Sequence, residues 1–144
     1  MNLWAALMLV AAGLFAGGAT SFAWSRVGIW RQMPAPAFID DFARTIHRTD
    51  KVQPALLVVA IVAAVGFAAT AEASARLLAL LGAGCLLATL AASVTVLVPL
   101  QRRIIRSTQG QPIEALRQRW FRGHLGRSAL SLVAFAATAL AVTV

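Results

Sequence analysis

Cysteine, histidine and acidic residues are scarce in this chain. Its 144 residues include one cysteine, two histidines and five acidic residues. The single cysteine, Cys85, excludes an intramolecular disulfide and a thiolate metal cluster, and two histidines are too few for the better-known zinc motifs. A glycine-rich phosphate loop is also missing, which excludes the usual nucleotide-binding motifs. The sequence therefore predicts no metal and no cofactor.

Charge is missing from long parts of the chain as well. Only 12% of the residues are charged and 60% are hydrophobic. A bilayer core about 30 Å thick requires about 20 mostly apolar residues in helical form. We therefore predict one all-α membrane domain over residues 1–144, a four-helix bundle whose helices span the bilayer. The spans are expected at about residues 3–24, 54–73, 77–100 and 126–144.

Positive charge is concentrated between the spans. The net charge is +8, which in a soluble protein would suggest nucleic acid as a partner. Here the positive-inside rule explains the charge better, so we expect a lipid bilayer and no nucleic acid as partner. We predict a multi-pass protein of the cell inner (plasma) membrane, with both termini outside and the first and third loops cytoplasmic. Those loops hold twelve of the thirteen cations: Arg26, Arg31, Arg44, Arg48, Lys51, Arg102, Arg103, Arg106, Arg117, Arg119, Arg122 and Arg127.

Both long loops contain a proline followed by apolar residues at helical spacing, at 34–48 and 112–120. This pattern predicts two short amphipathic helices at the level of the lipid headgroups, with Trp24, Trp30 and Trp120 in an aromatic belt. Each half of the chain thus reads as span, basic helix with one histidine, and span. A parallel internal repeat is one interpretation, although residue-level similarity between the halves is slight.

Ionisable residues are absent from the middle of each predicted span, which disfavours an ion pump or a coupled transporter. The candidates for chemistry lie instead in the loops. Trp120, His124 and Arg127 are spaced four and three residues apart, so one helix presents them on the same face. Such a face suits a flat, electron-rich or acidic substrate through stacking, proton transfer and charge pairing. An interfacial anchor is the alternative, with Trp120 among headgroups, Arg127 on a lipid phosphate and His124 facing water.

A second cluster surrounds His47, with Arg44, Arg48 and Asp50 close in sequence. A solvated helix end is one interpretation, and a contribution to substrate binding is another. Since His47 and His124 are predicted on the same side of the membrane, a haem held by both imidazoles is a further alternative to a cofactor-free protein.

The stretch from Val96 reads Val-Leu-Val-Pro-Leu-Gln-Arg-Arg, then a polar connection, then Trp120-x-x-x-His124-x-x-Arg127, then a final apolar span. This pattern resembles a family of small four-helix membrane proteins of unknown function that includes anthrone-oxygenase-like proteins. In that family the third helix ends in a Pro-x-Asn element. Gln101 stands where the asparagine is typical, so the amide is kept on a longer side chain.

The resemblance implies a shared site at the cytoplasmic end of the bundle, with Trp120, His124 and Arg127 as catalytic residues. In the oxygenase analogy, a phenolic or quinol-like substrate loses a proton to His124, Arg127 stabilises the phenolate, and Trp120 stacks on the ring. Oxygen then reacts with the anion without a cofactor. The residues expected to bind the substrate are Pro99, Gln101, His47, Arg48 and Asp50.

A competing class is a non-enzymatic accessory or assembly subunit. Gly13 and Gly17 in the first span have the small-xxx-small spacing that lets a neighbouring helix approach closely. Such faces would support a homo-oligomer or a larger membrane complex. The sequence leaves open whether the chain is an enzyme.

Overall fold

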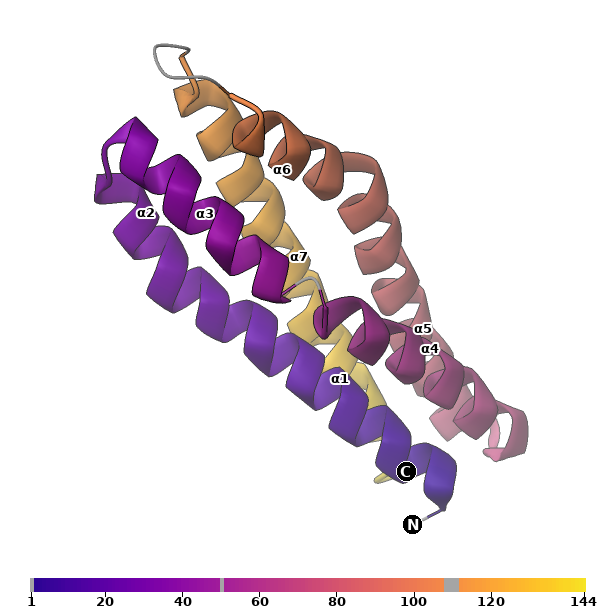
Figure 1. Cartoon of the computed structure of the whole chain (residues 1–144). Helices are drawn as coiled ribbons and strands as arrows, with labels where there is room; N and C mark the ends of the chain where they lie inside the picture. Colours follow the sequence, from indigo (N-terminus) through magenta and orange to yellow (C-terminus); the bar gives the residue numbers. More distant parts are fainter. Residues whose placement is uncertain (1, 50, 108–111) are drawn as a thin grey trace.

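The computed structural model describes residues 2–49, 51–107 and 112–144. In these ranges the chain is helical and contains no strand, and it forms four long helical segments. Each segment is long and apolar enough to cross a membrane. Together they form an up-and-down bundle in which both termini and the α4–α5 connection lie at one end (Figure 1). The predicted all-α four-helix bundle of a multi-pass membrane protein is therefore confirmed.

The first and third segments are interrupted at corresponding points. The first consists of α1 (Leu3–Phe22), the π-helical turn η1 (Ala23–Val27) and α2 (Gly28–Gln32). The third consists of α5 (Ala73–Ala92), the π-helical turn η2 (Ser93–Leu97) and α6 (Val98–Ile105). Each π-turn therefore follows a regular helix of 20 residues. Such turns re-aim the side chains beyond them and are frequent near functional sites.

The second segment contains α3 (Ala35–Thr49) and α4 (Gln53–Thr70), and the fourth is the single helix α7 (Glu114–Ala141). Pro34 follows α2, where it separates α2 from α3 because a proline cannot continue a helix interior. Pro54 occupies the first turn of α4, where its missing N–H costs nothing.

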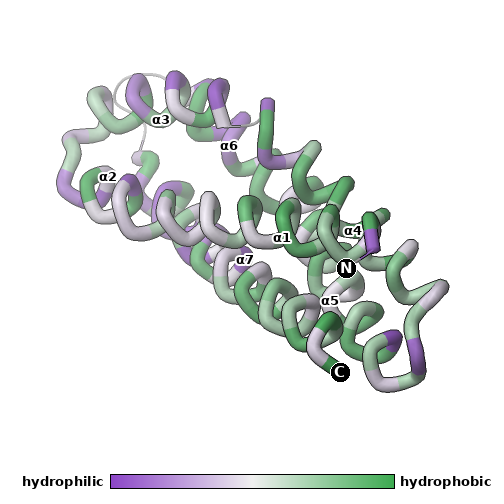
Figure 2. The backbone as a smooth tube through the Cα atoms, turned by 90° about the horizontal axis from the view of Figure 1, so that it is seen from below, coloured by the Kyte–Doolittle hydropathy of each residue, from purple (hydrophilic) through white to green (hydrophobic). Residues whose placement is uncertain are grey.

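Toward the end of the bundle that holds the termini, the interior consists mostly of small residues, and many large apolar side chains face outward. Buried alanines such as Ala12, Ala64 and Ala79 line the helix contacts, whereas Val10, Val62 and many other valines and leucines are exposed. Without a hydrophobic driving force inside lipid, close backbone approach is what holds membrane helices together. Figure 2 shows the same division along the bundle, with the termini in the hydrophobic part and α2 and α3 in the more hydrophilic part.

The opposite end of the bundle is filled with aromatic rings. Trp30, Phe38, Phe42, Trp120 and Phe121 are buried against one another in a single cluster. Trp30 lies edge-on to Trp120 at 5.9 Å between ring centroids, and Phe42 lies edge-on to Trp120 at 4.9 Å. Edge-to-face pairs of this kind contribute about 0.5–1.5 kcal/mol each beyond burial.

This aromatic cluster changes the expected picture of the two loops. The amphipathic segment at 34–48 is helical, as α3, but its apolar face is buried in the bundle through Phe38, Phe42 and Ile46. The segment after Pro112 is the beginning of α7 and not a separate helix. Trp30 and Trp120 are fully buried, and of the three predicted belt residues only Trp24 is exposed, at 83%. Where the bilayer lies along these helices stays a prediction.

Candidate functional site

A small cavity adjoins the aromatic cluster, where all four helical segments meet. α7 contributes Trp120, His124 and Arg127, α6 contributes Gln101 and α4 contributes Gln53. Its volume is about 10 Å³, which is room for a single water molecule or one oxygen atom of a ligand. The cavity is thus of atomic size and lined largely by polar side chains.

His124 is the most completely enclosed ionisable side chain of this cavity, with 1% of its surface exposed. Its ring is stacked on that of Trp120, with 5.0 Å between centroids and 5° between planes. Phe22 of α1 lies edge-on to the imidazole at 5.2 Å. The four-residue spacing on α7 produces the stack, and Phe22 prevents the ring from rotating toward α1.

Arg127 contacts the imidazole of His124. Its Nη2 lies 3.3 Å from His124 Nδ1 and donates to Gln53 Oε1 at 3.1 Å. A guanidinium can only donate hydrogen bonds, so the contact with His124 requires an unprotonated Nδ1. The Arg127 contact therefore favours the neutral tautomer that carries its proton on Nε2, which would present a donor there.

Two buried donors of this site have no hydrogen-bond partner among the described residues. They are His124 Nε2 and Trp120 Nε1. An unsatisfied buried polar atom costs about 1–3 kcal/mol, so native structures keep few of them without a reason. Because both residues line the same cavity, an oxygen acceptor placed in it is the simplest partner for the pair.

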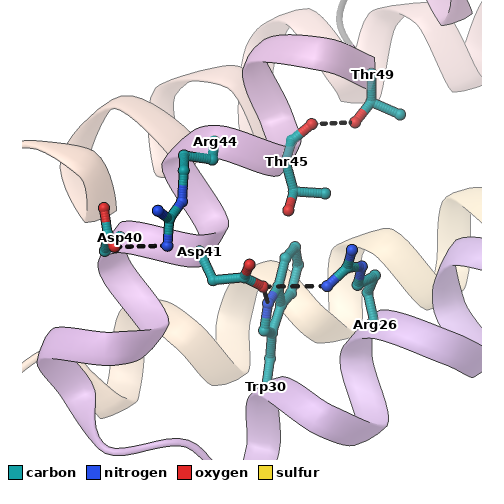
Figure 3. Close-up of polar contacts among 7 residues, drawn as sticks. All are labelled: Arg26, Trp30, Asp40, Asp41, Arg44, Thr45 and Thr49. Carbon is teal, nitrogen blue, oxygen red and sulfur yellow. Dashed lines mark hydrogen bonds and ion pairs between the residues drawn. The ribbon is translucent and has the colours of Figure 1, made fainter.

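A much wider groove adjoins the cavity between α1 on one side and α3 and α4 on the other. Its volume is about 910 Å³, within the range of small-molecule sites. Phe22, Thr49 and Gln53 line both the groove and the cavity, so these three side chains form the wall between them. At the polar end of the groove, Asp41 accepts hydrogen bonds from Trp30 Nε1 at 2.7 Å and from Arg26 at 3.3 Å (Figure 3).

Glycines allow the close contacts that hold this site together. A Cβ added at Gly123 on α7 would lie 2.8 Å from the Leu97 side chain of η2, which would have to shift. A Cβ added at Gly18 on α1 would lie 3.3 Å from Gln53 Nε2. Both substitutions would press on residues at or beside the cavity.

The structure brings four of the predicted site residues together: Gln101, Trp120, His124 and Arg127. Pro99 is exposed and lines a different hollow with Arg103 and Arg119. Arg48 lines the wide groove, His47 is exposed, and Asp50 lies outside the described residues. The roles of all these residues remain predictions.

Two of the alternatives drawn from sequence can be compared with this geometry. The interfacial anchor is wrong for Trp120 and His124, since each is 99% buried and neither faces water or headgroups. The haem alternative requires both imidazoles at one group, but His47 is exposed and His124 faces a space of about 10 Å³. Whether the protein binds a cofactor stays a prediction. Among the described residues, no group of three or more His, Cys, Asp or Glu could hold a metal ion.

Sequence reasoning missed Phe22, Thr49 and Gln53. Phe22 and Thr49 have no distinguishing local pattern, because their roles depend on tertiary contacts. Gln53 does have a signal, since it is a lone amide at the start of an otherwise apolar stretch. A polar side chain at the end of a membrane helix usually faces a partner or water.

Comparison with known proteins identifies the family. A family model described as anthrone oxygenase matches residues 42–137, about two thirds of the chain. The matched range includes Gln53, Gln101, Trp120, His124 and Arg127. No curated protein and no solved structure gives a significant match. On this match, the chain belongs to the anthrone oxygenase family.

Proposed function

We propose that the protein oxidises a flat phenolic or quinol-like aromatic compound of the anthrone class with molecular oxygen, without a cofactor. The observation that carries this proposal is the pair of unpartnered donors, His124 Nε2 and Trp120 Nε1, in a cavity next to a groove of small-molecule size. Family membership supports the same chemistry.

An anthrone is a tricyclic ketone with a CH2 group opposite its carbonyl, and its tautomer is a phenol. Loss of one C–H proton to water gives an anion whose charge rests mainly on the oxygen. This anion transfers one electron to O2, and the two radicals combine to form a C–O bond. The peroxide takes up a proton, then loses its second C–H proton as the O–O bond breaks. One CH2 group and one O2 thus become one C=O group and one H2O.

The chain's contribution is to stabilise the anion. The substrate oxygen enters the cavity and accepts hydrogen bonds from His124 Nε2 and Trp120 Nε1, while the rings stay in the groove. Arg127, in contact with the imidazole, supplies positive charge nearby. A donor fixed in advance where negative charge develops is worth up to about 10²–10³ in rate, and we expect the imidazole beside Arg127 to contribute more than the neutral indole.

The sequence suggests that His124 accepts the substrate's proton. The Arg127 contact instead favours His124 Nε2 as a hydrogen-bond donor. A glutamine at position 124 distinguishes the donor from the base, because an amide donates a hydrogen bond but does not take up a proton at neutral pH. We expect His124→Gln to retain at least a tenth of wild-type turnover, and His124→Ala to lose about 10²-fold. Equal losses in both variants would return His124 to the role of base.

The test uses protein purified in mild detergent and measures oxygen uptake and quinone formation with an anthrone. Arg122→Gln, an exposed change on the same helix, is the matched control. An absorption spectrum before and after reduction, for wild type and His124→Ala, tests the absence of a cofactor. A haem or flavin signature that disappears in the variant would contradict the cofactor-free mechanism.

The accessory-subunit alternative has one observation in its favour. Gly17 and Gly84 are exposed, and a Cβ added to either would meet none of the described residues within 4 Å. These positions leave room for a neighbouring helix of another protein or of a second copy. Gly17→Leu distinguishes an enzyme from an accessory subunit. The substitution should leave the turnover of an enzyme intact, whereas it should prevent an accessory subunit from assembling with its complex. Gly13 is unsuitable for this test, since it faces Phe135 inside the bundle.

We further propose that the protein lies in the inner (plasma) membrane with both termini outside, because basic loops are retained on the cytoplasmic side. In a Cys85→Ala background, a cysteine at Ala37 should be protected from a membrane-impermeant thiol reagent in intact cells. One at Ser74, in the α4–α5 connection region, should be labelled. The reverse pattern would invert the orientation.

A further inference from the structure

We infer that the groove between α1 and α3–α4 binds substrates with an acidic substituent, and that Arg44 and Arg48 recognise the carboxylate. The inference rests on the proposed function, because it assigns the substrate class of the same site.

Polarity changes from one end of the groove to the other. α1 and α4 contribute Leu14 and Leu56 at one end, and η1 and α3 contribute Arg26, Asp41 and Arg44 at the other. The groove thus grades from a lipid-like surface to a cationic one. An amphiphile with an apolar body and an anionic head matches this gradient.

The lining is positively charged overall. Arg26, Arg44 and Arg48 face one acidic residue, Asp41, so the described lining has a net charge of +2. Asp41 is already engaged by Trp30 and Arg26 (Figure 3). The negative charge of Asp41 is therefore largely balanced by Arg26. It does not neutralise Arg44 and Arg48.

Arg44 and Arg48 are available to an incoming anion. They are four residues apart on α3 and therefore neighbours on one face. Arg44 pairs with Asp40 at 2.7 Å, but both side chains are about two-thirds exposed, and such pairs contribute about 0–1 kcal/mol. Arg48 is exposed in the groove wall. A carboxylate is planar, and its two oxygens can accept two parallel hydrogen bonds from one guanidinium.

The arginines are placed correctly relative to the reaction cavity. Arg48 precedes Thr49, which belongs to the wall shared by groove and cavity. A substrate with its carboxylate on Arg44 and Arg48 lays its rings against Phe22 and Gln53, next to that wall. The acidic group and the reacting oxygen are then bound at different points, which orients the ring system.

The experiment measures binding and turnover separately. Quenching of tryptophan fluorescence by anthraquinone-2-carboxylate, an unreactive probe, is compared with quenching by the uncharged 2-hydroxymethyl analogue in nonionic detergent. We expect the carboxylate to bind about tenfold more tightly, and the advantage to disappear in Arg44→Gln/Arg48→Gln. The control is Arg102→Gln/Arg106→Gln, an exposed pair with the same spacing and charge loss at the C-terminal end of α6.

Several results would overturn the inference: equal binding of the two probes, an advantage that persists in the groove variant, or the same loss in the control. Phosphatidylglycerol is added in a competition arm. If it displaces the probe as effectively as a second aromatic carboxylate does, the groove binds lipid headgroups and the inference is wrong. Carboxylate-selective binding without any oxidation of an anthrone carboxylate would refute the proposed function alone. Oxidation without carboxylate preference would refute the inference alone.

Discussion

The two halves of the chain share one plan but differ in what surrounds their histidines. Each half begins with a 20-residue helix followed by a five-residue π-turn, and the second copy starts 70 residues after the first, at Ala73 rather than Leu3. In the first half His47 is exposed next to the buried Ile46. In the second half His124 is buried on Trp120 and contacts Arg127.

The difference shows that the plan of helices alone does not make a site. His47 lies one position away from the buried face of α3, and on a helix one residue turns a side chain by about 100°. His124 lies on the buried face of α7, where rings from α1 and α7 enclose it. The internal repeat that the sequence suggests agrees with the equal lengths of α1 and α5 and of the two π-turns, whereas the later helices differ in length. Only the second histidine acquires a buried environment.

The largest expected effect separates the two histidines directly. His124→Ala should lower turnover by about 10²-fold, because it removes a preorganised donor to the developing oxyanion. His47→Ala should change turnover by less than twofold, since His47 is exposed and does not line the cavity. Oxygen uptake with an anthrone measures both. Comparable losses in the two variants would break the distinction between the halves.

A second prediction concerns the packing of α5 against α7, within the second half. A Cβ at Gly82 of α5 would lie 2.6 Å from Thr138 Cγ2 and 3.2 Å from the Ala134 carbonyl oxygen of α7. Gly82→Ala should therefore destabilise the fold by about 1–3 kcal/mol through overpacking. The matched control is Gly84→Ala, two residues along the same helix, where the added methyl meets none of the described residues within 4 Å. Thermal unfolding in detergent measures both, and equal melting temperatures would contradict the close α5–α7 contact.

A third prediction tests what the first half contributes to the site. Gln53→Ala removes the oxygen that accepts from Arg127 and opens the wall between groove and cavity. Turnover should fall about tenfold, the equivalent of one charged hydrogen bond of about 1.4 kcal/mol. Gln53→Glu keeps an acceptor and should restore part of the loss. If Gln53→Ala is as active as wild type, the second half forms the site without the first.

The smallest effect is expected from the indole donor. Trp120→Phe retains the stacked ring on His124 and removes only the Nε1 hydrogen. We expect a severalfold loss of turnover with an unchanged melting temperature, because a neutral hydrogen bond contributes about 0.5–1.5 kcal/mol. A large drop in stability would instead assign Trp120 a packing role.

The sequence predicts more of this site than of its surroundings. Helical spacing alone places Trp120, His124 and Arg127 on one face, and the family resemblance adds Gln101. Neither could predict Phe22 and Gln53, because these residues reach the cavity through contacts between helices far apart in sequence. The amphipathic pattern of α3 predicts a helix, but it does not predict where the helix lies. The same pattern fits a helix on a membrane surface and a helix packed on a protein core. Only the aromatic partners Trp30, Trp120 and Phe121 distinguish the two.

The most direct test of the central claim follows the oxygen atoms. Purified protein is incubated with an anthrone under ¹⁸O2, and the quinone is examined by mass spectrometry, with His124→Ala in parallel. The cofactor-free mechanism predicts one ¹⁸O atom in each quinone formed by the wild type, its rate reduced about 10²-fold in the variant. Unlabelled quinone, or equal labelling rates in both proteins, would contradict oxygenation at a site built around His124.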